Sequence, residues 1–120
     1  GLAFQIKDDI FDYGSPNNIG KPTGIDIREQ KLTLPIIYTL RNAPLKIQKE
    51  LKKIIKNRNE EAHMIKRATS LVIEHGGIDY AFERMNKLAQ EAKDLLKEYP
   101  EGEAKEALIG LVNYTINREK

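Results

Sequence analysis

The sequence predicts an all-α protein, and two features of its residue pattern support this. Hydrophobic residues recur every three or four positions along most of the chain, as they do on one face of a helix. No segment alternates between polar and apolar residues for long enough to form a β-strand. The chain has 120 residues, 40% of them hydrophobic and 32% charged, which is the size and composition of one globular domain or part of one.

Turn-forming residues divide the chain into six expected helices. Gly, Pro and Asn cluster between the apolar segments, most clearly in the loop from Gly14 to Gly24. We expect Asn59 to cap the fourth helix and Gly76 to end it in the left-handed conformation. The expected helices span residues 2–13, a segment that begins between 28 and 33 and ends near 40, and then 44–56, 59–75, 78–96 and 103–117.

Charge and hydropathy exclude several classes of protein. The net charge is +2 and basic residues alternate with acidic ones, which argues against nucleic-acid binding. The lysine-rich segment 46–56 is interpreted as a solvated helix face, or alternatively as a surface that meets an acidic partner. No apolar run is long enough to span a membrane and no signal peptide is recognisable, so we expect a cytoplasmic protein. A helical pattern already runs at residue 2 without a capping residue, which suggests a cut through a larger protein.

An acidic stripe lies on the first expected helix. At about 100° per residue, Gln5, Asp8, Asp9 and Asp12 fall within an arc of about 100°, and apolar residues occupy most of the remaining circumference. We therefore expect a helix buried on most sides, with the stripe facing a cavity. Clustered carboxylates that lose hydration are costly unless a cation neutralises them, and Mg²⁺ is suited to oxygen ligands and phosphates. The alternative is an acidic surface face with no ligand.

Charged residues follow the stripe at short range. Lys21 and Lys31 lie on or beside a loop containing glycine, where they are placed to meet phosphate charge. Asp26 lies between them and is suited to hold metal-bound water. This order of residues favours a magnesium–diphosphate site over a plain acidic surface.

Three short motifs carry a resemblance to a known family. In chain order they are Phe4-Gln5-Ile6-x-Asp8-Asp9-x-x-Asp12, Gly20-Lys21-x-x-Gly24-x-Asp26 and Lys31-x-Thr33-x-Pro35. Together they resemble the second aspartate-rich region of the trans-isoprenyl (polyprenyl) diphosphate synthases. The match is conspicuous over residues 2–40, whereas the later helices agree only in pattern and position.

The resemblance implies a partial terpenoid-synthase-type helical bundle, with residues 1–120 as the carboxy-terminal part of the domain. The first DDxxD motif of the family is absent from this chain. The whole enzyme would use Mg²⁺ to condense an allylic diphosphate with isopentenyl diphosphate, and would be a homodimer. The isolated chain is expected to be inactive, and its own oligomeric state is left open because apolar surface would be exposed. A non-catalytic helical subunit or regulatory partner is the alternative.

The resemblance also assigns roles in metal binding. Asp8 matches the direct magnesium ligand of the family. Asp9 and Asp12 match residues that bind the metal or hold its water molecules, and Asp26 matches a residue that holds such water.

Substrate contacts are implied in the same way. Lys21 and Lys31 match lysines that contact the allylic diphosphate, and Gln5 matches a glutamine that lines the cavity. The terminal residues Arg118 and Lys120 are similar to a basic tail that closes over isopentenyl diphosphate in some members, although a frayed, solvated tail is the simpler interpretation.

One position departs from the family pattern. Many members have glycine immediately before the lysine that matches Lys31, and this chain has Gln30. The larger side chain is expected to be able to move the loop, which makes the role of Lys31 less secure than that of Lys21.

Overall fold

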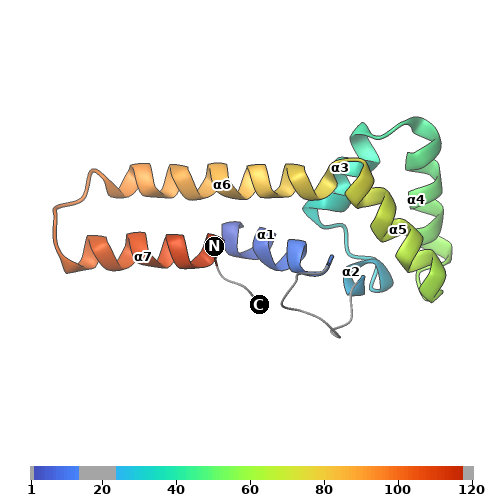
Figure 1. The fold of residues 1–120 in the computed structure, drawn as a ribbon, viewed down its shortest axis with the longest axis horizontal. Helices are drawn as coiled ribbons and strands as arrows, with labels where there is room; N and C mark the ends of the chain where they lie inside the picture. Colours follow the sequence, from blue (N-terminus) through green and yellow to red (C-terminus); the bar gives the residue numbers. More distant parts are fainter. Residues whose placement is uncertain (1, 14–23, 118–120) are drawn as a thin grey trace.

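A computed structural model describes residues 2–13 and 24–117, and this part of the chain consists of helices joined by turns, without a β-strand (Figure 1). The predicted fold class is therefore confirmed. Within these residues there are seven helices: α1 (Leu2–Phe11), α2 (Ile25–Arg28), α3 (Leu34–Asn42), α4 (Leu45–Asn57), α5 (Ala62–Glu74), α6 (Gly77–Leu96) and α7 (Glu103–Asn117).

The short helix α2 is the main difference from the sequence prediction. After Gly24 the sequence indicated a single helix, whereas the structure has two. Residues 14–23 of the predicted loop lie outside the described residues. Four residues are too few to show a hydrophobic period, so the pattern gave no sign of α2. Thr33 immediately precedes α3, and Pro35 lies in its first turn, where a missing backbone N–H is tolerated.

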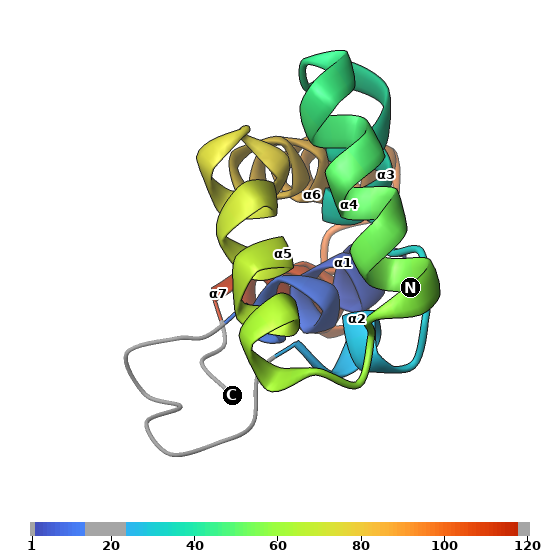
Figure 2. The same cartoon turned by 90° about the vertical axis from the view of Figure 1, so that its right-hand side faces the viewer.

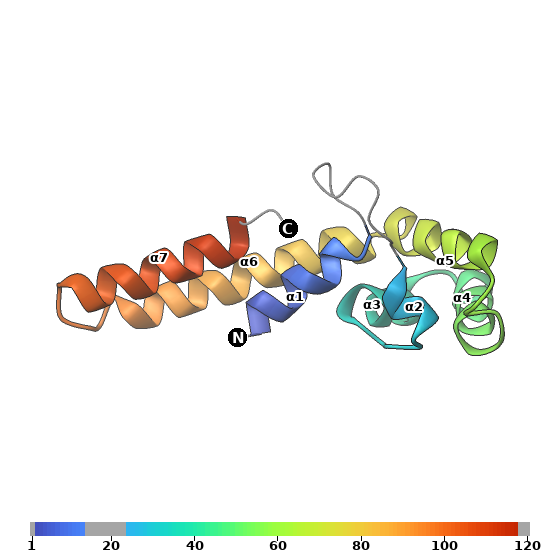
Figure 3. The same ribbon diagram turned by 90° about the horizontal axis from the view of Figure 1, so that it is seen from below.

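The helices form an elongated body with extents of 53 × 31 × 20 Å. The 20-residue helix α6 runs along most of its length, and α1 and α7 both pack against it (Figures 1 and 3). Helices α2 to α5 gather at the amino-terminal end of α6, and Figure 2 views this group end on. The acidic helix α1 therefore lies between the α6–α7 hairpin and the group of shorter helices.

Two hydrophobic cores hold these parts together. The larger core lies among α2, α3, α4 and α5. The smaller core lies between two helices, α1 and α6. Gly77 allows α3 to approach α6, because a Cβ at this position would lie 2.7 Å from the Pro35 carbonyl oxygen. The buried residues of the larger core are Ile27, Ile36, Leu51, Ile54, Ile55, Ile65, Ala68, Leu71 and Val72. Those of the smaller core are Ile6, Ile10, Ala81 and Met85.

The predicted helix signals have mixed outcomes. Gly76 has φ 82°, which confirms the left-handed end of α5. Asn59 does not cap α5, because that helix begins at Ala62 and Glu61 occupies the capping position. The Asn59 side chain instead donates a hydrogen bond to the Arg28 carbonyl oxygen, at 2.7 Å. None of the described helices has both the length and the apolar composition needed to cross a membrane.

Candidate functional site

The acidic stripe lies on the side of α1 that faces away from the small core. Ile6 and Ile10 are buried against α6, whereas Asp8 and Asp9 are half-buried. Gln5 is exposed, and its side-chain amide donates a hydrogen bond to Asp9 Oδ1 at 3.1 Å. Gln5 and Asp9 are one turn apart, so the predicted common face of these residues is present.

The first turn of α1 is more exposed than its apolar residues led us to expect. Leu2 and Phe4 retain 62% and 42% of their accessible surface. The helix is therefore buried along one side and at its carboxy-terminal end, and the expectation that it is buried on most sides is wrong for this turn.

Asp12 joins the acidic helix to α2. Its two carboxylate oxygens accept hydrogen bonds from the backbone N–H groups of Ile25, at 3.0 Å, and Asp26, at 3.2 Å. Its carbonyl oxygen accepts a third, from the Gly24 N–H at 3.0 Å. Since the first N–H groups of a helix have no partner within it, the carboxylate satisfies two of them in α2. This contact brings Asp26 next to the stripe, as the sequence order suggested.

Two carboxyl groups in this region hold their protons more tightly than usual. Burial, together with the charges of Asp12 and Asp9, raises the pKa of Asp26 to about 6, although Lys31 acts in the opposite direction. Burial also raises the pKa of Asp9; the Gln5 hydrogen bond opposes this, and the charges of Asp8 and Asp12 add to it. The carboxylates are thus close enough to repel one another and are partly removed from water.

Lys31 is the predicted cation that the structure places beside these carboxylates. It is exposed and forms an ion pair with Glu29, at 2.9 Å between Nζ and Oε2. The hydrogen bond that Lys31 donates to Glu29 and the charge of Glu29 raise the pKa of Lys31, with smaller contributions from Asp26 and Asp9. The other predicted basic residues, Lys21, Arg118 and Lys120, lie outside the described residues.

The donor set suits a hydrated magnesium ion. Among the residues that the structure describes, no three acidic or histidine side chains converge closely enough to hold a metal between them. Mg²⁺ keeps several water molecules and is bound through one or two carboxylates plus phosphate oxygens, so it does not require a cage made only of protein groups. Half-buried carboxylates that repel one another are compatible with such an ion.

The raised pKa of Asp26 predicts a pH dependence of stability in the absence of divalent cations. The folded state keeps the proton to about pH 6, whereas the unfolded state releases it near 3.8. The folded state is therefore favoured at low pH, and this contribution is lost as the pH rises from about 4 to about 6. We expect wild type to lose stability relative to Asp26→Asn as the pH rises over that interval, as measured by thermal unfolding, because the asparagine does not titrate. A difference that stays constant from pH 4 to pH 7 would contradict the assignment.

Lys7 is a buried residue that sequence reasoning did not identify. Its side chain is on α1 and only 8% of the residue is exposed. Its Nζ donates a hydrogen bond to the Ile116 carbonyl oxygen at 3.0 Å and lies 5.3 Å from the ring centroid of Phe11 and 5.2 Å from that of Phe82. A cation is favourable near the carboxy terminus of a helix and over aromatic rings. No sequence pattern distinguished this lysine from a solvated one.

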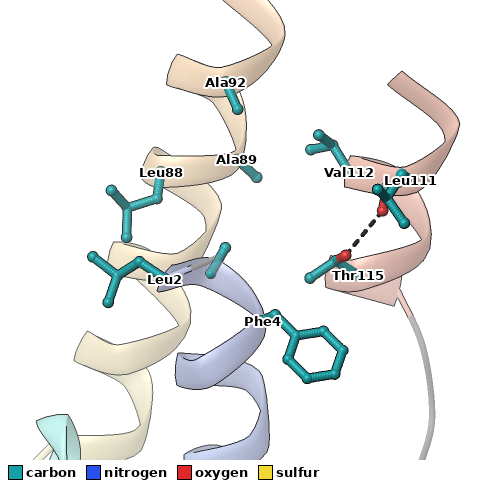
Figure 4. A pocket seen from close by; sticks show the side chains of 9 residues that line it. Leu2, Phe4, Leu88, Ala89, Ala92, Leu111, Val112 and Thr115 are labelled. Atoms are coloured by element: carbon teal, nitrogen blue, oxygen red, sulfur yellow. Dashed lines mark hydrogen bonds between the residues drawn. The ribbon is translucent and has the colours of Figure 1, made fainter. Parts of the chain in front are cut away.

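An apolar groove of about 290 Å³ lies at the amino-terminal end of α1, between α6 and α7 (Figure 4). Leu2 and Phe4 border it on α1, Leu88 on α6 and Leu111 on α7. Leu111 retains 60% of its accessible surface. The lining residues carry no charge that would bind a diphosphate, so the groove is separate in chemistry from the aspartates.

Comparison with known proteins agrees with this geometry. Residues 1–72 match the family model described as polyprenyl synthetase. The chain is 37% identical over 123 residues to a geranylfarnesyl diphosphate synthase from Aeropyrum pernix, covering all of this chain and 37% of that protein. It is 33% identical to an octaprenyl diphosphate synthase from Haemophilus influenzae, covering 98% of this chain and 36% of that one. The chain thus spans little more than a third of the length of these relatives.

Solved structures show the same likeness in three dimensions. A geranylgeranyl pyrophosphate synthetase from Pyrococcus horikoshii superimposes with a TM-score of 0.86 at 32% identity, covering 99% of this chain and 36% of that one. A polyprenyl synthase from Caulobacter crescentus, complexed with calcium and isoprenyl diphosphate, gives a TM-score of 0.82 at 32% identity, over 98% of this chain and 36% of that one. Because the family model covers more than half of the residues and the fold agrees throughout, this chain belongs to the polyprenyl synthetase family.

Proposed function

We propose that this chain is part of a prenyltransferase that condenses an allylic diphosphate with isopentenyl diphosphate to make trans-polyprenyl diphosphates, and that it supplies half of the magnesium–diphosphate site. The observation that carries the proposal is the contact between Asp12 and the amino terminus of α2. It places Asp26 close enough to Asp12 and Asp9 for their charges to raise its pKa. Membership of the family supports it, as does the calcium and isoprenyl diphosphate bound to the Caulobacter relative.

The acidic residues have distinct roles in this proposal. Asp8, which is partly exposed on α1, is the direct ligand. Asp9 and Asp26 bind or orient metal-bound water, and Asp12 does so while also holding the amino terminus of α2. Bound Mg²⁺ would neutralise the diphosphate and help it to leave.

The remaining residues bind and orient the substrates. Lys31, together with Lys21, attracts the diphosphate of the allylic substrate, and Gln5 faces its hydrocarbon chain. Arg118 and Lys120 are assigned to isopentenyl diphosphate. During the reaction the allylic carbon–oxygen bond breaks and its electron pair goes to the diphosphate. The double bond of isopentenyl diphosphate then attacks that carbon, and loss of a proton completes the product.

The proposal extends to the whole protein. Residues 1–120 lack the first aspartate-rich motif, so they are expected not to catalyse condensation alone. A cytoplasmic location and a homodimer remain predictions for the whole gene product.

Removal of the metal tests this function. The whole gene product, incubated with an allylic diphosphate and isopentenyl diphosphate, is expected to form longer prenyl diphosphates and release pyrophosphate only when Mg²⁺ is present. Chelation with EDTA should stop the reaction and added Mg²⁺ should restore it, because the diphosphate leaves as a multiply charged anion. Residues 1–120 alone should yield no product. A whole gene product that binds both substrates but forms no product would favour a non-catalytic helical partner instead.

A further inference from the structure

Gln30, which lies between α2 and α3, has a left-handed backbone conformation with φ 60°. It is the one non-glycine residue with positive φ in the part of the chain that the structure describes. This conformation is disfavoured for residues that carry a Cβ atom, so the surrounding contacts must stabilise it.

The Gln30 side chain provides such contacts. Its Nε2 donates hydrogen bonds to the carbonyl oxygens of Ile55, at 3.0 Å, and Lys56, at 3.2 Å. Both carbonyls belong to the last turn of α4, where helical carbonyl groups have no partner within the helix. The nitrogen must face them, because an amide oxygen in its place would meet two other oxygens.

Asn59 makes the reciprocal contact. Its Nδ2 donates a hydrogen bond to the carbonyl oxygen of Arg28, the last residue of α2, at 2.7 Å. The carboxy terminus of α4 is therefore bound by the amide of Gln30, which follows α2. The carboxy terminus of α2 is bound by the amide of Asn59, which follows α4. We refer to Gln30 and Asn59 together as the amide bridge.

The amide bridge holds the segment that carries two of the candidate site residues. A helix of four residues such as α2 is not stable alone. Its amino terminus is held by the Asp12 carboxylate and its carboxy terminus by the amide bridge. Asp26 lies between these attachments and Lys31 directly follows Gln30. The Lys31 N–H donates to the Asp26 carbonyl oxygen at 2.8 Å, which ties the two residues together.

We propose that Gln30 is a positioning residue: through the amide bridge it holds Lys31 and Asp26 beside the aspartates of α1, ready for a diphosphate. The inference rests on the proposed function, because a diphosphate is the ligand that this placement would serve. Without the bridge, the exposed turn around Lys31 would retain its position mainly through the buried side chain of Ile27.

Two substitutions separate the hydrogen bonds from the backbone conformation. Gln30→Met keeps a side chain of similar length but removes the donor, whereas Gln30→Gly removes the donor and also tolerates positive φ. In both, the whole gene product is expected to bind inorganic pyrophosphate about tenfold more weakly in the presence of Mg²⁺, as measured by calorimetry. The melting temperature should fall less in Gln30→Gly than in Gln30→Met. A purely structural role would make pyrophosphate binding follow the melting temperature instead.

A matched control is available at the opposite end of α4. Gln48 Nε2 donates a hydrogen bond to the Ala43 carbonyl oxygen at 2.8 Å, so Gln48→Ala removes a similar bond far from Lys31. This variant should bind pyrophosphate as wild type does, whereas Asn59→Ala should weaken binding. Hydrogen exchange of the Lys31 amide, measured without ligand, should be faster in Gln30→Met.

The outcomes distinguish failure of the positioning role from failure of the proposed function. Wild-type pyrophosphate binding by Gln30→Met and Gln30→Gly, together with unchanged exchange at Lys31, overturns the positioning role and leaves the proposed function intact. If the unaltered gene product shows no magnesium-dependent binding of pyrophosphate, the proposed function and the inference fail together.

Discussion

Replacement of Asp8 by alanine is expected to lower the condensation rate of the whole gene product by about 10²–10³-fold, because it removes the carboxylate assigned to bind the metal directly. Asp8 lies on the partly exposed face of α1, where its loss opens no cavity in the core. Helical content and melting temperature should therefore stay close to those of wild type. The measurement is the rate of pyrophosphate release at saturating substrates and magnesium.

Asp79→Ala is the matched control for this prediction. Asp79 is an exposed aspartate in the first turn of α6, away from the acidic stripe, and its loss should leave the rate unchanged. A decrease of less than about tenfold for Asp8→Ala would remove Asp8 from its assigned role. An equal decrease in both variants would point to a general effect of lost negative charge.

Replacement of Gly24 by alanine is expected to destabilise the protein by about 2–5 kcal/mol. Gly24 has φ 74°, a conformation that residues with a Cβ atom rarely adopt. A Cβ atom here would also overlap the Cγ2 atom of Ile65, which is buried in the larger core. Because Gly24 donates its N–H to the Asp12 carbonyl oxygen, the strain would act on the contact between α1 and α2. Denaturant unfolding followed by circular dichroism measures the change.

Gly110→Ala provides the opposite case. Gly110 lies within α7, where an added Cβ would meet no atom within 4 Å. Alanine is favoured over glycine inside a helix by about 0.5–1 kcal/mol, so this variant should be more stable than wild type. A Gly24→Ala protein as stable as wild type would contradict the steric role of Gly24, and a destabilised Gly110→Ala protein would contradict the open space at Gly110.

The helical class and most helices could be predicted because their signals are local. Amphipathic repeats continue over ten or more residues in α4, α5, α6 and α7, and Gly76 ends α5 as its position suggests. The acidic stripe was also a local signal, since Asp12 follows Asp8 by four positions, about one helical turn. Asp12 itself lies just after the end of α1. The structure adds that Asp12 also binds the amino terminus of α2. This contact could not be predicted, because it depends on the position of Ile25 in the fold.

The features that sequence analysis missed depend on residues far apart in the chain. Asn59 resembles a helix cap in sequence, but its amide is used by the Arg28 carbonyl, 31 residues earlier. In sequence, Lys7 resembles any helical lysine. Only the structure shows that its Nζ lies near the rings of Phe11 and Phe82 and donates to the Ile116 carbonyl oxygen. Gln30 was identified only as an unusual residue, and its hydrogen bonds to α4 explain how the turn accommodates it.

The hydrogen bond from Lys7 to Ile116 joins residues 109 positions apart. Helix α1 therefore acquires one of its neighbours only after residue 116 has been synthesised. In the interval its apolar side, including Ile6 and Ile10, lacks the contacts that α6 and α7 later provide, and such exposed apolar surface favours association with other chains. Contacts of such long range also slow folding, so the segment bearing the aspartates should be among the last to reach its native environment.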